Sequence, residues 1–150
     1  MGQQQLLLLV LATVIVGLAT VAGIQAFDEN KAQATQDALV QRATTLATDI
    51  QTLTNKPQAL GGVKPVKDLT SSDKSKILDR LGYEDGKDAV HIKAPAAGGD
   101  PSTTGCKLIT QDEKADSGTA MIECNAPDAP QTVQVVLDPS ADDPISTQFK

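Results

Sequence analysis

A long apolar run near the start of the chain constrains the fold more than any other feature of the sequence. The 21 residues of Leu6–Ala26 contain no charged residue and only three polar ones, Thr13, Thr20 and Gln25. A helix needs about 20 apolar residues to cross the hydrocarbon core of a bilayer, which is about 30 Å thick. The run therefore predicts a helix that spans a membrane, or one that neighbouring protein helices bury on all sides.

A cleaved signal peptide is the alternative interpretation of this run. Signal peptides combine a basic start, an apolar stretch of 7–15 residues and a small-residue cleavage site. Here residues 3–5 are all Gln, the apolar run is longer, and residues 24–26 (IQA) form only a weak cleavage site. Lys and Arg usually orient a membrane helix, yet the first of them is Lys31. Met1 is then either the initiator or the first residue left after removal of a basic leader, and both possibilities stay open.

The helical pattern continues beyond the apolar run but becomes one-sided. Spacings of three and four residues separate the apolar positions, which is typical of an amphipathic helix: Leu39, Ala43, Leu46, Ile50 and Leu53. The first Pro after the run is Pro57. We therefore expect one helix from about Gln3 to Asn55, about 80 Å long. A short coiled coil is the alternative for its second half.

The remaining segment, residues 56–150, alternates short apolar stretches with Pro, Gly, Asn and Asp. Residues 71–82 predict a short helix that Ser71 or Ser72 caps and Gly82 ends. Four strands are expected at residues 89–93, 106–110, 118–126 and 132–137, and their order favours an antiparallel meander. Its inward side chains should be drawn from one set or from their opposite-face neighbours: Leu108, Met121, Val133 and Val135.

These patterns predict an α+β fold in which a long N-terminal helix packs on a small antiparallel sheet. The chain divides into an apolar half-helix at residues 1–27, an amphipathic half-helix at residues 28–55, and a small globular domain at residues 56–150. The stripe between Leu39 and Leu53 has the length needed to cover one side of the sheet.

Two cysteines, Cys106 and Cys124, lie in consecutive predicted strands. Neither belongs to a CxxC pair, and with only one His in the chain they do not form a convincing zinc set. Because the N-terminal run indicates export, we expect them to form a disulfide, which would stabilise the domain by about 3 kcal/mol. Two reduced core cysteines in a cytosolic chain are the alternative.

Composition and motifs argue against several classes of function. A net charge of −6 with 2% aromatic residues is unfavourable for binding nucleic acid. The single histidine, His91, has no catalytic partner pattern, and GxSxG, P-loop and GxGxxG motifs are absent. We therefore expect neither an enzyme nor a cofactor. A calcium site at Asp138, Asp142 and Asp143 is less favoured than a solvated acidic loop, and residues 98–105 could accept an O-linked sugar.

A long helix that is apolar and then amphipathic, placed before a small disulfide-containing sheet, resembles the type IV pilins. In that family the apolar half-helix holds the subunit in the membrane and later packs in the core of a helical filament. The resemblance covers residues 1–55 in pattern and the rest in architecture. It implies that twelve side chains pack in a filament core: Leu6, Leu7, Leu8, Leu9, Val10, Leu11, Val14, Ile15, Val16, Leu18, Val21 and Ile24.

The sequence departs from the pilin pattern at several positions. Met1 stands where Phe is common, and the neutral Gln5 replaces a Glu, so Gln5 can only accept a hydrogen bond from a neighbour's N-terminal amine. No Pro interrupts the helix, which leaves Gly17 and Gly23 as its weak points. These glycines either loosen on assembly or allow close helix contact.

The resemblance implies a structural subunit of an extracellular filament that stays in the inner membrane before assembly. Its partners would be further copies of itself, the membrane and a pilus assembly machinery. Two alternatives remain. One is a single-span anchor carrying an exported binding domain, and the other is a minor pseudopilin of a secretion apparatus.

Overall fold

The computed structural model describes residues 2–83, 91–92, 105–111, 113, 115–116 and 118–150. One long helix, one short helix, three 3₁₀ turns and five strands make up these residues. In chain order they are α1 (Gly2–Asn55), η1 (Gln58–Leu60), η2 (Val66–Asp68), η3 (Ser71–Asp73), α2 (Lys74–Leu81), β1 (His91–Ile92), β2 (Gly105–Ile109), β3 (Ala120–Asn125), β4 (Val133–Leu137) and β5 (Ile145–Phe149).

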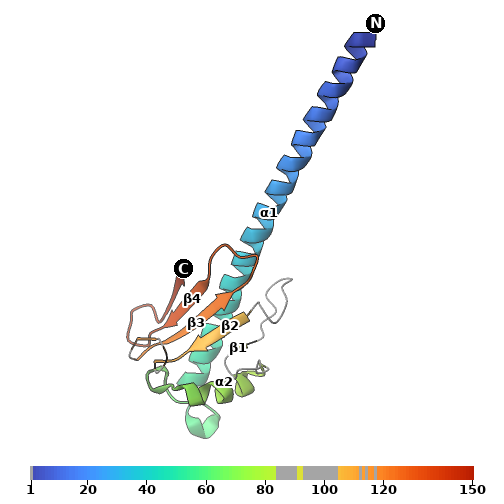
Figure 1. Cartoon of the computed structure of the whole chain (residues 1–150). Coiled ribbons are helices and arrows are strands. Elements are labelled where there is room, and N and C mark those ends of the chain that lie inside the picture. The colour runs from blue at the N-terminus through green and yellow to red at the C-terminus, as the bar shows by residue number, and fades with distance from the viewer. Residues whose placement is uncertain (1, 84–90, 93–104, 112, 114, 117) are drawn as a thin grey trace.

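The predicted long helix is confirmed as α1, which runs unbroken from Gly2 to Asn55. Its first half projects away from the rest of the chain, and its second half lies against the sheet (Figure 1). The buried side chains of α1 lie between Thr35 and Thr54 and include the whole predicted stripe: Leu39, Ala43, Leu46, Ile50 and Leu53. Burial on α1 therefore begins at Thr35, and the predicted division between residues 27 and 28 stays a prediction.

The five strands form one antiparallel sheet in the order β1-β2-β3-β4-β5. The second half of α1 covers one face, mainly over β3 and β4. Side chains on this face are almost fully buried: Cys106, Leu108, Ala120, Ile122, Cys124, Val133, Val135 and Leu137. The predicted α+β fold, a long helix on a small antiparallel sheet, is confirmed.

Two details of the predicted sheet are wrong. Met121 is only half-buried, and its neighbour Ile122 occupies the core, because successive residues of a strand point to opposite faces. The sheet also contains a strand that the sequence pattern did not predict, β5. Four of its five residues are exposed, so this strand lacks the apolar alternation that identified the others.

The short helix begins differently from the prediction. Thr70, not Ser71 or Ser72, is the N-cap, and it forms a capping box with Asp73 that opens the 3₁₀ turn η3 and leads into α2. Gly82 ends the helix as predicted, in the left-handed conformation with φ 73°. Ile77 and Leu78 of α2 are buried in the same core as the stripe of α1.

Among the residues that the structure describes, Asp73 is the buried carboxylate. Its Oδ2 accepts hydrogen bonds from Lys64 Nζ at 2.9 Å, from Thr70 Oγ1 at 2.8 Å and from the Thr70 backbone N–H at 3.3 Å. Burial acts to raise the pKa of Asp73, but the hydrogen bonds from Lys64 and Thr70 outweigh burial and lower this pKa below its ordinary value.

The lowered pKa of Asp73 predicts a pH-dependent contribution to stability. The contribution is present above the ordinary Asp pKa of about 3.9 and is lost as the pH falls through the lower folded-state pKa. Asp73→Asn should therefore reduce the free energy of unfolding by about 2 kcal/mol at pH 7. The difference from the wild type should shrink towards pH 2. Urea titrations in detergent, followed by the fluorescence of the half-buried Tyr83, measure it, and a difference independent of pH would contradict the assignment.

Candidate functional site

The largest exposed apolar surface among the described residues is the first half of α1. We call residues 2–27 the apolar half-helix. An 18-residue window in it has a mean hydropathy of 2.7, and none of that window is buried. α1 is thus long and apolar enough to cross a membrane, although a signal sequence would meet the same criteria. All twelve side chains predicted to pack in a filament core are exposed in the single chain: Leu6, Leu7, Leu8, Leu9, Val10, Leu11, Val14, Ile15, Val16, Leu18, Val21 and Ile24.

The two threonines of the apolar half-helix have hydroxyl partners within the helix. Thr13 Oγ1 donates to the carbonyl of Val10 and Thr20 Oγ1 to the carbonyl of Gly17, both at 2.8 Å. An unpaired hydroxyl is costly to bury, whereas a paired one is not. The threonines therefore do not hinder transfer of this surface into lipid or into a bundle of protein helices.

The side chains of α1 change from apolar to charged where the helix approaches the globular domain. Phe27 is 73% exposed, and the acidic Asp28 and Glu29 follow it directly. One turn further on, Lys31 Nζ lies 3.1 Å from a carboxylate oxygen of Asp128, in the connection between β3 and β4. The uncharged run of α1 therefore ends at Phe27.

Gly17 and Gly23 lie within the regular part of α1, which has no break at either residue. Apart from the neighbouring residues and backbone of α1 itself, a Cβ atom added at either glycine would meet no atom within 4 Å. Both positions are therefore free to contact another helix closely. Loosening of this segment on assembly stays a prediction.

The predicted disulfide joins Cys106 of β2 to Cys124 of β3. The two residues are direct cross-strand partners, with Cα atoms 4.0 Å apart, and both are fully buried. They lie on the face of the sheet that α1 covers. The disulfide therefore ties two central strands together beneath the helix.

The other residues singled out from the sequence are not brought together. Asp138 Oδ1 accepts hydrogen bonds from the Ser140 backbone N–H and hydroxyl, at 2.9 and 2.6 Å, and these bonds lower the pKa of Asp138. The described residues contain no group of three or more His, Cys, Asp or Glu that could hold a metal ion. Asp142 and Asp143 are exposed, as expected for a solvated acidic loop. The backbone of His91 pairs with Lys107 in the sheet.

Some predictions fall outside the described residues or remain untested. Met1 and most of the suggested sugar-acceptor loop, residues 98–104, lie outside the residues that the structure describes. Gln5 is exposed on the first turns of α1. Its role at a subunit contact stays a prediction.

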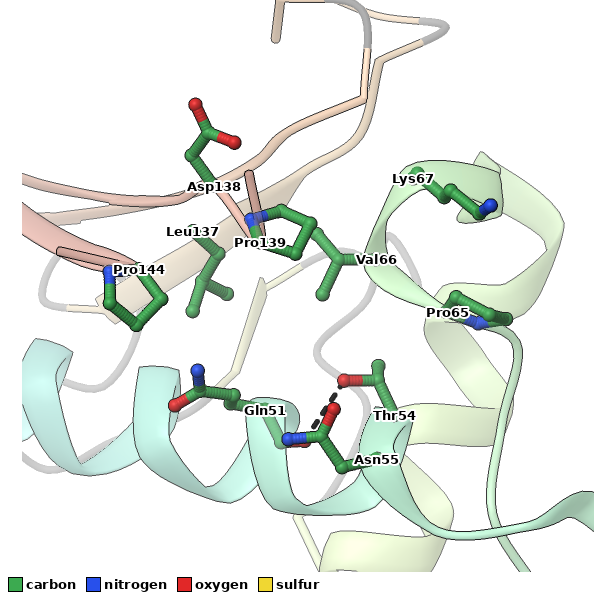
Figure 2. A pocket seen from close by; sticks show the side chains of 10 residues that line it. All are labelled: Gln51, Thr54, Asn55, Pro65, Val66, Lys67, Leu137, Asp138, Pro139 and Pro144. Atoms are coloured by element: carbon green, nitrogen blue, oxygen red, sulfur yellow. Dashed lines mark hydrogen bonds between the residues drawn. The ribbon is translucent and has the colours of Figure 1, made fainter. Parts of the chain in front are cut away.

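A pocket of about 190 Å³ lies where the end of α1 meets η2 and the connection between β4 and β5 (Figure 2). Val66, Leu137, Pro139 and Pro144 supply its apolar walls. The side chains of Asp138 and Lys67 point away from its centre in Figure 2. Its lining therefore offers mainly apolar contact.

No protein-family model, no curated protein and no solved structure matches the chain. The geometry itself therefore carries the functional argument. It combines a disulfide-containing α+β domain with an uncovered apolar half-helix that continues the domain's own central helix.

Proposed function

We propose that the chain is the structural subunit of a type IV pilus-like filament that polymerises through its apolar half-helix. The observation that carries the proposal is the complete exposure of this half-helix on a folded domain. Burying one aliphatic side chain is worth about 1.5–3 kcal/mol, so the twelve together strongly oppose exposure of this surface to water and require a cover of lipid or protein. In this proposal the membrane covers the apolar half-helix first, and other copies of the chain cover it later.

The continuity of α1 supports a filament over a simple anchor. A tethered binding domain needs only a flexible connection to its membrane helix, whereas here residues 28–34 continue as helix without a linker. The apolar half-helix is thereby held in a fixed direction relative to the sheet, as a regular polymer requires. A single-span anchor remains the alternative, because the same helix could span a membrane.

Fractionation and imaging of expressing cells test the proposal. Shearing should release filaments that contain the chain, and before assembly the chain should be found in the inner membrane. A chain that stays in the membrane fraction and forms no filaments would support the anchor instead. A filament in which the chain is a rare component would indicate a minor pseudopilin.

The glycines of the apolar half-helix give a second test. Gly costs about 1 kcal/mol relative to Ala inside a helix, so Gly17→Ala with Gly23→Ala should stiffen this segment. We expect fewer filaments per cell, because the helix either must loosen on assembly or must contact its neighbours closely. A filament map separates the two causes, since close packing leaves the helix continuous through residues 17–23. A normal yield from the double variant would contradict both.

A further inference from the structure

β5 forms one edge of the sheet, and in the described part of the chain no strand pairs with its outer side. It leads to the end of the chain marked C in Figure 1. Natural proteins usually protect a sheet edge with a very short strand, a charged side chain or a proline. The opposite edge, β1, is only two residues long, whereas the five residues of β5 (ISTQF) include no charge and no Pro. β5 is therefore an unprotected edge that a further strand can extend.

The hydrogen bonds between β4 and β5 show which backbone groups of β5 remain available. Thr132 and Lys150 exchange two backbone hydrogen bonds of 3.0 Å, and the Asp138 N–H donates to the Pro144 carbonyl at 3.0 Å. In an antiparallel ladder, bonded pairs alternate with non-bonded pairs, so the backbone groups of alternate residues point to opposite edges. The residues of β5 whose N–H and C=O groups point away from β4 are therefore every second one: Ile145, Thr147 and Phe149.

The side chains of these three residues lie on the face of the sheet that α1 covers, because each is paired with a buried β4 residue: Leu137, Val135 and Val133. The cover is incomplete at β5. Ile145 is half-buried, Thr147 is exposed, and Phe149 is 54% exposed. A strand added beside β5 would thus satisfy its outward backbone groups and also cover apolar side chains.

We infer that β5 pairs with β5 of a second copy of this chain, antiparallel, about a two-fold axis at Thr147. In this register Thr147 lies opposite Thr147 of the other copy, and Ile145 lies opposite Phe149 of the other copy. Every outward N–H and C=O group of the three residues then gains a partner. The two Ile145–Phe149 contacts are pairs of a β-branched and an aromatic side chain, which stabilise neighbouring strands.

The charges at the ends of β5 favour a second copy as the occupant. Asp142 and Asp143 come shortly before the strand, and Lys150 follows it directly. Antiparallel pairing of two copies brings the acidic start of one strand close to the Lys150 side chain of the other, at both ends of the contact. Parallel pairing would bring the two acidic starts together. A two-fold interface requires such self-complementarity, because the same surface of each copy forms both halves.

The two-fold axis also determines the relative direction of the two copies. Two antiparallel strands are related by an axis perpendicular to their sheet, and α1 lies along one face of this sheet (Figure 1). The rotation keeps both α1 helices on the same face and reverses their direction, so the two apolar half-helices cannot enter one bilayer side by side. All copies in one polar filament share a direction. If the proposed function holds, the paired copies therefore belong to two filaments that run in opposite directions.

Cysteine cross-linking tests this register in the full-length chain. Ser146 and Gln148 are exposed, and in the proposed pair they lie opposite each other with Cα atoms about 4.5 Å apart, which suits a disulfide. Ser146→Cys and Gln148→Cys chains in detergent should form disulfide-linked dimers about fivefold more when mixed than when either is oxidised alone. In the unmixed samples the new cysteines are only diagonal neighbours, about 7–8 Å apart. Cys106 and Cys124 are bonded to each other and take no part.

Substitutions at Thr147 test whether the β5 edge is responsible. Thr147→Pro, added to both cysteine chains, removes an outward N–H and should lower the cross-linked fraction about fivefold. The Tm in detergent should stay close to that of the wild type, because this N–H does not bond β4. Thr147→Lys places two ammonium groups opposite each other and should act similarly. Gln58→Lys, at an exposed position outside the sheet, is the matched control for added charge.

The outcomes separate this inference from the proposed function. Equal cross-linking in mixed and unmixed samples, or cross-linking that neither Thr147 variant lowers, would overturn pairing through β5. Cross-linking that follows the predicted pattern would support it. Failure of the wild type to form filaments would overturn the proposed function and leave this measurement in detergent unaffected.

Discussion

The Leu9→Asp chain is expected to form no filaments while its globular domain stays folded. Leu9 lies in the middle of the first exposed leucine turns and is 66% exposed in the single chain. If other helices or lipid surround it, a carboxylate at this position loses its hydration without gaining a partner, at a cost of several kcal/mol per copy. This penalty repeats in every subunit, so assembly should be abolished and not merely slowed.

Leu60→Asp is the matched control for this prediction. Leu60 lies in η1, at the opposite end of the domain from the apolar half-helix, and is 77% exposed. The same substitution on a similarly exposed leucine should leave the filament yield unchanged. Electron microscopy of sheared material measures the yield, and Tyr83 fluorescence reports whether each domain is folded. Normal filaments from Leu9→Asp would show that the apolar half-helix is not a packing surface.

Replacing Cys106 and Cys124 together with Ala should lower the free energy of unfolding by about 3 kcal/mol. The disulfide closes a loop of sequence separation 18 between two buried strand positions, so its loss frees the unfolded chain more than it disturbs the folded one. Urea titration of the double variant and the wild type in the same detergent measures the difference. The folds should remain alike, because Ala is small enough for both buried positions.

The oxidation state has its own measurement. The native protein, taken from the cell without reductant, should not react with a thiol reagent until it has been unfolded and reduced. Ready labelling before reduction would mean that the cysteines are free in the cell, which would count against export of the protein. A double Ala variant as stable as the wild type would show that the disulfide contributes little to the folded domain.

The sequence predicted those parts of the fold where hydrophobic periodicity is strong. Apolar spacing alone was enough to predict the burial of two segments, the stripe from Leu39 to Leu53 and the β4 run from Val133 to Leu137. β5 could not be predicted from apolar spacing because most of its side chains are exposed to solvent. Backbone pairing with β4, and not burial, makes this segment a strand. Met121 and Ile122 are both apolar, and the register with β4 decides which of them enters the core.

The features of the candidate site differ in the same way, because some follow from composition and others depend on contacts within the folded chain. Composition is enough to identify the apolar half-helix, since a run this long without a charged residue needs lipid or other helices around its whole circumference. The hydrogen bonds of the α1 threonines required the structure, because a threonine pattern in sequence does not show whether its hydroxyls face solvent or their own helix. The cap at Thr70 was missed for a similar reason, since three successive hydroxyl residues, Thr70 to Ser72, compete for one position.

The unbroken course of α1 also determines how mechanical force passes through the molecule. A pull on the apolar half-helix is transmitted along consecutive backbone hydrogen bonds from Gly2 to Asn55, with no hinge to absorb it. It reaches the sheet as shear on the side chains between Leu39 and Leu53, which pack against β3 and β4. Many such contacts must slide together before the helix can leave the sheet. The Cys106–Cys124 bond prevents β2 and β3 from separating under the same load. Tension should therefore extend α1 itself before it opens the domain.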